Sequence, residues 1–271
     1  MLIGPARGDA LHVMTFNLRY ASDTPPNEWS RRRPAMAELL RTERPTVLGT
    51  QEGLYAQLKD VQHDLPDRYD WIGVGRAGGS RDEFMAVFYD TVRLEPLEYD
   101  HFWLSETPGV IGSRSWASGS IRMVTWVRFA DHRTRTEFVV LNTHLDNQSE
   151  QARVRGAELI RSRLDGIAMG QPIVVTGDFN AAAGASAPYD ILAHGTGLTD
   201  TWNTATEWVT PAYATFHGYH PPAPHGARID WILARGAVSV PAVAVNTFSR
   251  DGQFPSDHCP VQTLVTITTP R

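Results

Sequence analysis

The chain has 271 residues, of which 42% are apolar and 20% charged, and its formal net charge is −5. This length suits one large α/β domain or two small ones, and the composition is that of an ordinary globular protein. An acidic chain lacks the overall positive charge that favours tight, sequence-independent binding to long nucleic acid. Cys259 is the only cysteine, which excludes an intrachain disulfide.

Nothing in the sequence predicts a membrane segment or an export signal. No stretch approaches the ~18 consecutive apolar residues of a membrane-spanning helix. The N-terminal residues hold no apolar run long enough for a signal peptide. We therefore expect a cytoplasmic protein without a membrane span, and we expect it to be a monomer. Export stays an alternative if a signal peptide has been removed.

The predicted secondary structure combines many strands with a few helices. β-Branched and aromatic residues mark the strands, and helical spacing of apolar residues marks the helices. Ser149 is a suitable N-cap for the third helix. In chain order we expect a strand at 11–17, a helix at 29–44, a strand at 46–51, a helix at 54–65, strands at 84–89, 121–129 and 137–142, a helix at 149–164, and strands at 173–176, 229–233, 238–245 and 261–268.

Two long loops rich in Pro, Gly and Ser interrupt this pattern, at 105–120 and 203–227. Loops of this length in a compact domain are usually functional or mobile. No repeat or low-complexity linker divides the chain, so we expect a single domain over residues 10–271 behind an N-terminal tail of residues 1–9. Many strands and few helices fit two sheets packed face to face, with helices outside them.

Polar residues recur where the predicted strands end. A lone Asp after a strand is usually a turn residue, and a lone Asn or His there is usually a cap or a hydrogen-bonded core group. Asp230 differs because it lies inside a strand, where a buried carboxylate needs a partner. Six such positions in one chain indicate a common site rather than six turns. They hold Asn17, Glu52, Asn142 with His144, Asp178 with Asn180, Asp230, and Asp257 with His258.

The residue types at these positions favour a hard metal ion. Carboxylate and amide oxygens suit Mg²⁺ or Mn²⁺, and the chain has no CxxC or HExxH motif for zinc. No GxSxG motif offers a nucleophilic serine. A thiol nucleophile at Cys259 is disfavoured, because neighbouring residues in an extended segment point to opposite faces and His258 would face away. Metal, carboxylate and histidine together suit hydrolysis of a phosphoester.

Six short motifs resemble the endonuclease/exonuclease/phosphatase superfamily, which includes DNase I, AP endonucleases and deadenylases. They occur in the family's order and cover nearly the whole chain: TFNLR at 15–19, QE at 51–52, NTHLD at 142–146, GDFN at 177–180, RIDWI at 228–232 and SDHCPV at 256–261. Further segments, at 16–20, 27–33, 102–108, 122–126 and 215–218, resemble bacterial members similar to deadenylase and nocturnin domains. The resemblance implies an α/β fold, the DNase I-like four-layer α/β/β/α sandwich of two packed mixed sheets.

The resemblance also implies roles for the metal-binding side of the site. Glu52 corresponds to the principal Mg²⁺ ligand, with Mn²⁺ as an alternative ion. Asn17 lies beside it, and Asp257 corresponds to a second-site or water-mediated ligand. Asp178 corresponds to the residue that orients or deprotonates the attacking water, and Asn180 to the residue that holds the phosphoryl oxygen.

The remaining implied roles concern the transition state and the substrate. His258, oriented by Asp230, would stabilise the pentavalent transition state. His144 would contact a phosphate oxygen. The resemblance further suggests substrate contacts at Arg122, His217, Asn142 and Arg19.

Departures from the family's subgroups narrow the substrate. The inositol 5-phosphatase pattern has an arginine soon after the GDxN motif, whereas Ala181, Ala182 and Ala183 follow Asn180 here. The chain shows no basic cluster like the DNA-kinking loops of AP endonucleases. The disulfides of DNase I are impossible with one cysteine, and the loop around Trp116 is a poor match to the membrane hairpin of secreted sphingomyelinases.

Three functions remain open from the sequence. The first is a Mg²⁺-dependent phosphodiesterase or exonuclease that acts on RNA or a nucleotide-like substrate. The second is a phosphomonoesterase, or a phosphodiesterase for a small sugar, nucleotide or lipid-head-group phosphate, which the net charge of −5 favours. The third is a noncatalytic binding module, which the complete set of motif residues argues against.

Overall fold

The computed structural model describes residues 1–268 and contains two large β-sheets. In the first sheet β1 and β2 are parallel neighbours, with Asn17 opposite Gln51 at their carboxyl ends. The strand order in this sheet is β12 (Glu207–Trp208), β14 (Val238–Val245), β15 (Val261–Ile267), β1 (Ala10–Asn17), β2 (Val47–Gln51), β6 (Val87–Asp90) and β4 (Tyr69–Ile72).

The second sheet is also mixed. Strands β9 and β10 run parallel and place His144 opposite Asp178, while β13 runs antiparallel to β10 and places Asp230 opposite Asp178. The strand order is β11 (Thr199–Asp200), β13 (Asp230–Arg235), β10 (Ile173–Asp178), β9 (Glu137–His144), β8 (Met123–Asp131) and β7 (Leu94–Trp103). A separate pair, β3 (Gly53–Leu54) and β5 (Glu83–Phe84), follows β2.

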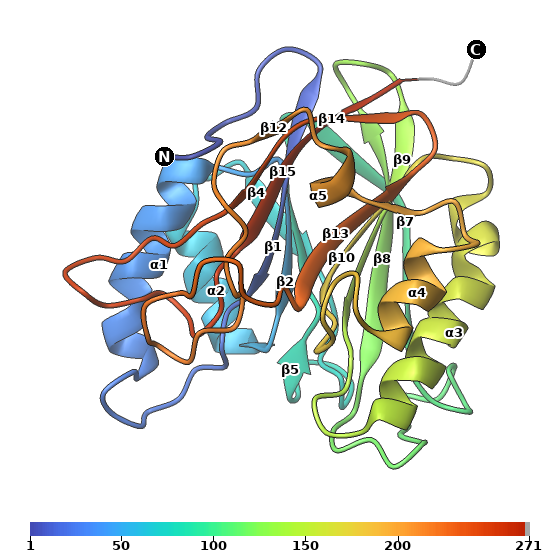
Figure 1. Ribbon diagram of the computed structural model, residues 1–271, viewed down its shortest axis with the longest axis horizontal. Coiled ribbons are helices and arrows are strands. Elements are labelled where there is room, and N and C mark those ends of the chain that lie inside the picture. Colours follow the sequence, from blue (N-terminus) through green and yellow to red (C-terminus); the bar gives the residue numbers. More distant parts are fainter. Residues whose placement is uncertain (269–271) are drawn as a thin grey trace.

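Helices cover the outer faces of both sheets, and the sheets pack against each other in the middle (Figure 1). On one side lie α1 (Trp29–Glu43) and α2 (Tyr55–Asp64), and on the other α3 (Glu150–Ala168) and α4 (Ala187–Ala193). The short α5 (Thr201–Thr204) joins β11 to β12. The chain therefore forms the predicted four-layer α/β/β/α sandwich. Within residues 1–268, no helix combines the length and the apolar character that a membrane crossing requires.

The central strands are apolar on both faces because each face meets a different layer. In β1, Leu11 and Val13 belong to the core between the sheets, whereas Met14 and Phe16 belong to the core under α1 and α2. The alternation follows from the two-residue repeat of a strand. The same alternation in β10 sends Val174 to the core between the sheets and Val175 to the core under α3 and α4.

The predicted elements are confirmed, with several differences. Strand β7 was not expected, because its sequence LEPLEYDHFW contains a proline and three acidic residues. It lies at the sheet edge, where proline and exposed charges are tolerated. The strand expected at 84–89 is divided into β5 and β6. Strand β4, helix α4 and the short elements β3, β11, α5 and β12 were not predicted. Ser149 caps α3 as expected, since its side chain accepts a hydrogen bond from the Ala152 N–H at 3.1 Å.

Candidate active site

The candidate site lies where strand ends from both sheets meet. The carboxyl ends of β1 and β2 carry Asn17 and Glu52, and those of β9 and β10 carry His144 and Asp178. Glu52 follows β2 directly with a positive φ of 63°, so the chain turns at the residue that presents the carboxylate. A Cβ atom at Gly177 would lie 2.7 Å from the Thr143 carbonyl oxygen, which explains why glycine precedes Asp178.

Asn17, Glu52 and Asp178 form the centre of the cluster. The Asn17 Nδ2 donates to Glu52 Oε1 at 3.0 Å and to Asp178 Oδ2 at 2.9 Å. One amide thus links a carboxylate of the first sheet to a carboxylate of the second. The Asn17 Oδ1 accepts from the Arg19 N–H at 2.9 Å, which determines that the amide nitrogen faces the two carboxylates.

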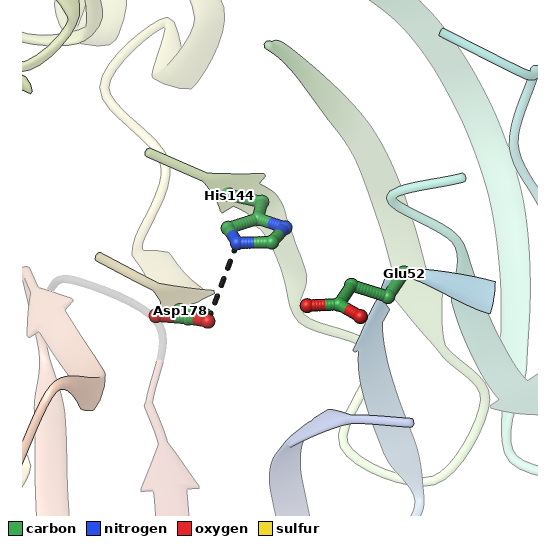
Figure 2. A group of neighbouring side chains, drawn as sticks. All are labelled: Glu52, His144 and Asp178. Atoms are coloured by element: carbon green, nitrogen blue, oxygen red, sulfur yellow. Dashed lines mark ion pairs between the residues drawn. The ribbon is translucent and has the colours of Figure 1, made fainter. Parts of the chain in front are cut away.

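His144 completes this side of the cluster. Figure 2 shows its imidazole above Asp178 and facing the Glu52 carboxylate, with His144 Nε2 3.3 Å from Asp178 Oδ2. Burial and the nearby Arg122 lower the pKa of His144, against the opposing effect of Asp178. Burial raises the pKa of Asp178, but His144 and His258 outweigh it and hold the pKa below its usual range. At neutral pH Asp178 is therefore a carboxylate and His144 a neutral imidazole.

His258 and Asp230 form a buried ion pair on the other side of Asp178. The His258 Nδ1 lies 2.9 Å from Asp230 Oδ2, and its Nε2 lies 3.7 Å from Asp178 Oδ2. Burial lowers the pKa of His258, but Asp230 and Asp178 outweigh it and raise the pKa to about 10. Burial raises the pKa of Asp230 to about 6. The imidazole is accordingly protonated at neutral pH and directs its Nε2–H toward the cluster.

Asn180 lies beside His144 at the start of the loop after β10. Its Nδ2 donates to the Leu145 carbonyl at 3.0 Å and lies 3.1 Å from His144 Nε2. Its backbone N–H donates to Asp178 Oδ1 at 2.9 Å. The GDFN motif thus forms a tight turn, with φ of 48° at Asn180, that directs both polar side chains to the same edge.

Arg122 lies behind this edge and is held by the segment that follows β9. Its Nη2 donates to Asn147 Oδ1 at 3.1 Å, and its Nε lies 3.5 Å from Asp146 Oδ2. The side chain is buried, and its Nη1 has no hydrogen-bond partner among residues 1–268. An unsatisfied buried guanidinium nitrogen close to His144 is suited to bind an anion.

Arg19 lies between two carboxylates of the first sheet. Its Nη1 is 3.7 Å from Glu52 Oε2, and its Nε is 3.7 Å from Asp257 Oδ2. Burial and the nearby Glu52 raise the pKa of Asp257, against the opposing effect of His258. The structure therefore places Asp257 and Arg19 next to Glu52, although neither contacts Asp178 directly.

Two predicted substrate contacts lie elsewhere. Asn142 is fully buried below the site, and its amide connects the two sheets. His217 lies on the loop over Asp257, where its Nδ1 is 2.9 Å from the His220 carbonyl oxygen and its backbone N–H donates to the Asp257 carbonyl. Asn142 is thus inaccessible to a substrate in this structure, and His217 lies at the outer edge of the site.

Three residues of the site had no role assigned from sequence. Thr215 Oγ1 accepts from the Asp230 N–H at 3.1 Å, and Ser256 Oγ donates to the Asn17 carbonyl at 2.6 Å. Phe216 packs edge-on against His258, with ring centroids 5.1 Å apart, yet remains 51% exposed. All three lie in or beside the recognised motifs, but only tertiary contacts reveal what they touch.

The donor set fits a divalent metal ion. Ligand atoms of Glu52, His144 and Asp178 lie within 4.8 Å of one another, as do those of Asp178, Asp230 and His258. The second group is already paired internally through Asp230 and His258, so the first group fits an ion better. The carboxylates of this group suit Mg²⁺ or Mn²⁺, whereas an imidazole is a poorer ligand for these ions.

Comparisons with known proteins give matches over nearly the whole chain. Residues 14–258 match the model of the Endonuclease/Exonuclease/phosphatase family. An endonuclease/exonuclease/phosphatase from Bacteroides vulgatus is 31% identical over 95% of this chain and 99% of its own, with a TM-score of 0.89. A mannosyl-6-phosphatase from Bacteroides thetaiotaomicron is 32% identical over 94% and 99%, with a TM-score of 0.88.

More distant structures share the fold. The human nocturnin catalytic domain, with a bound sulfate anion, is 17% identical over 96% of this chain and 94% of its own, with a TM-score of 0.75. No match was found among curated protein sequences.

Proposed function

The chain belongs to the endonuclease/exonuclease/phosphatase family, whose members are phosphoesterase hydrolases, and we propose that it is a Mg²⁺-dependent phosphomonoesterase that acts on a sugar phosphate. The proposal of phosphoester hydrolysis rests on the buried cluster of side chains where the strand ends of the two sheets meet. It combines an ionised carboxylate, a protonated imidazole, a neutral imidazole and a metal-binding carboxylate around one point.

Each residue of the cluster has a role that follows from its contacts. Glu52 would hold the metal ion, with Asp257 as an outer ligand and Asn17 beside it. Asn17 has only its Oδ1 for an ion, because its Nδ2 donates to Glu52 and Asp178. A bound Mg²⁺ would neutralise charge that develops on the phosphoryl oxygens.

The protein's own groups handle the water and the phosphoryl oxygens. Asp178 remains ionised at neutral pH and accepts a hydrogen bond from the attacking water, which orients its lone pair. The protonated His258 donates from Nε2 to a phosphoryl oxygen and stabilises the pentavalent transition state. Asn180, His144 and the free Nη1 of Arg122 surround the remaining oxygens on the side of the second sheet.

Two observations support a sugar phosphate as substrate. The chain is similar over nearly its whole length to a mannosyl-6-phosphatase. The half-exposed ring of Phe216 lies next to His258, where the group that carries the phosphate would emerge. The apolar face of a sugar ring packs well on such a phenyl group.

A nucleotide or RNA-like diester is the second candidate, and the exposed Phe216 ring also favours it. Aromatic side chains stack on nucleobases as well as on sugars. The net charge of −5 disfavours a long nucleic acid, but it leaves a short or mononucleotide substrate open.

The test uses the purified protein with Mg²⁺ and three substrates: a hexose 6-phosphate, glycerol 3-phosphate and a bis-aryl phosphodiester, each with an EDTA control. Turnover of the hexose phosphate that EDTA abolishes supports the proposal. Turnover of the diester alone supports the nuclease-like alternative and contradicts the monoesterase.

The role of Phe216 is tested with Phe216→Ala, with Trp208→Ala as the matched control. Trp208 is also 51% exposed and lies on the edge strand β12. Phe216→Ala should lower kcat/KM for the hexose phosphate roughly tenfold or more. It should lower kcat/KM for glycerol 3-phosphate much less, because this substrate has no ring. Equal loss with both substrates would contradict a contact with the sugar ring.

A further inference from the structure

Arg32 of helix α1 is a fully buried cation whose hydrogen bonds all go to backbone carbonyl groups. A guanidinium has five N–H donors, and in Arg32 each of the five finds one acceptor. The acceptors are the carbonyl oxygens of Asn27 (from Nε, 2.8 Å), Leu18 and Pro255 (from Nη1, both 2.9 Å), and Arg19 and Tyr20 (from Nη2, 3.0 and 3.1 Å).

Burying the Arg32 charge without a carboxylate partner costs free energy of folding, which indicates that the arginine has a structural purpose at this position. A buried charge loses its hydration, and a buried arginine is usually paired with a carboxylate that compensates for the loss. Among residues 1–268 no carboxylate lies within hydrogen-bonding or ion-pairing distance of Arg32. Burial accordingly lowers the pKa of Arg32, although the guanidinium stays charged at neutral pH.

Two of the carbonyl groups that Arg32 binds, those of Leu18 and Arg19, belong to peptide units that contact the metal-binding side of the site. In a trans peptide the C=O and the N–H point in opposite directions. Because the Leu18 carbonyl points at Arg32, the N–H of Arg19 points away from it and donates to Asn17 Oδ1 at 2.9 Å.

The next peptide unit repeats this pattern. The Arg19 carbonyl points at Arg32, and the N–H of Tyr20 points the other way and donates to Glu52 Oε2 at 3.2 Å. Arg32 therefore holds two successive peptide planes, one of which orients the Asn17 amide while the other orients the Glu52 carboxylate. The left-handed φ of 53° at Arg19 joins the two planes.

The hydrogen bond to the Pro255 carbonyl also connects Arg32 to the loop that precedes β15. Pro255 precedes Ser256, whose Oγ donates to the Asn17 carbonyl at 2.6 Å and accepts the His258 N–H at 3.2 Å. One side chain from α1 thus connects the segment after β1 to the segment that carries Asp257 and His258.

We propose that Arg32 is a positioning residue for the metal site, whose guanidinium orients Asn17 and Glu52 through the peptide groups of residues 18–20. The inference rests on the proposed function, because it assigns the affinity of that site for a divalent ion to a residue that touches neither ion nor substrate. Lysine cannot replace Arg32, since an ammonium has three donors for five carbonyl groups. Of these five, the Arg19 carbonyl has a second donor, Gln57 Nε2 at 2.9 Å.

The experiment measures Mn²⁺ binding directly, by calorimetry or by electron paramagnetic resonance, alongside Mg²⁺-dependent turnover and thermal unfolding. Arg32→Lys should weaken Mn²⁺ binding about tenfold or more, the size of effect seen when outer-shell partners of metal ligands are removed. Arg33→Lys is the matched control, because Arg33 is the next residue of the same helix and pairs with Asp60 at 2.7 Å and Asp64 at 2.8 Å, away from the site. It should leave Mn²⁺ binding unchanged.

Arg32→Met provides a second variant, because it removes the charge together with its desolvation cost. Weakened Mn²⁺ binding in a variant that still unfolds cooperatively supports the proposal. Wild-type Mn²⁺ affinity in either folded variant overturns it, and so does loss of cooperative unfolding in both variants, since Arg32 would then serve overall stability. Failure of the wild-type protein to bind Mn²⁺ or to hydrolyse phosphoesters would refute the proposed function itself, which makes the two failures distinguishable.

Discussion

The imidazole of His258 lies 2.9 Å from the carboxylate of Asp230, and both side chains are buried. Asp230 thereby determines the orientation of the ring whose Nε2 faces Asp178. We expect Asp230→Asn to lower kcat by roughly 10²-fold, because the amide keeps the shape but loses the ion pair. The affinity for Mn²⁺ should stay within about twofold of wild type. A parallel loss of Mn²⁺ binding would place Asp230 in the metal site instead.

Asp178→Asn should lower kcat by about three orders of magnitude, since the amide cannot accept the water's hydrogen bond in the same way as the carboxylate. The Asn17 Nδ2 and His144 would also lose a charged partner. Steady-state kinetics with saturating Mg²⁺ measure the effect, and circular dichroism checks that the variant is folded. Near-wild-type turnover in the folded variant would remove Asp178 from the reaction.

Glu52→Ala should raise the Mg²⁺ concentration needed for half-maximal activity by at least about tenfold. Ligand atoms of Glu52, His144 and Asp178 lie within 4.8 Å of one another. Burial raises the pKa of Glu52, but the nearby His144 and the hydrogen bond from Asn17 outweigh it and lower the pKa, so the group is ionised. A Mg²⁺ titration of activity with wild type and variant side by side measures the shift. An unchanged titration midpoint would show that the ion binds elsewhere.

Asn142→Ala should destabilise the fold while leaving the chemistry intact. Its Nδ2 donates to the carbonyl groups of Thr50 and Ala86, and its Oδ1 accepts from Gln51 and Thr176, so one amide joins the two sheets. Loss of several buried hydrogen bonds should lower the free energy of unfolding by about 3 kcal/mol. Urea unfolding measures this loss. An unchanged KM for the phosphoester at 20 °C below the melting midpoint would separate Asn142 from substrate binding, whereas a large rise in KM would restore its predicted role as a substrate contact.

His12 should make stability depend on pH in the mildly acidic range. Burial lowers the pKa of His12 from 6.5 to about 4, so the native imidazole stays neutral while the unfolded one is protonated near pH 6.5. The unfolded state then binds more protons between pH 6.5 and 4, and stability falls as pH falls through this window, by about 3 kcal/mol at most. Above pH 6.5 the contribution is complete.

The measurement for His12 compares the free energy of unfolding of wild type and His12→Gln across pH 4 to 7. The variant should show the smaller slope between pH 6.5 and 4, because it removes the titrating group. Equal slopes would mean that other groups carry the acid sensitivity.

Local patterns in the sequence predicted which residues meet at the sheet edges. Apolar runs on β1, β2, β9 and β10 end in Asn17, Glu52, His144 and Asp178, and the carboxyl ends of neighbouring parallel strands lie at one edge. The many strands and few helices also predicted two sheets packed face to face with helices outside them. Edge strand β7 was not predicted, because its exposed residues and Pro96 interrupt the apolar pattern of a strand.

What these residues and their supporting side chains contact became visible only in the folded protein. It placed Asn142 between the sheets although its motif resembles a site motif, and it showed that Arg32, Thr215 and Ser256 hold the site from behind. Strand-end positions follow from local periodicity. The partners of a buried guanidinium or hydroxyl, by contrast, come from segments far apart in the chain. The Arg32 side chain meets the Pro255 carbonyl across 223 residues of sequence, a separation at which no local pattern specifies the contact.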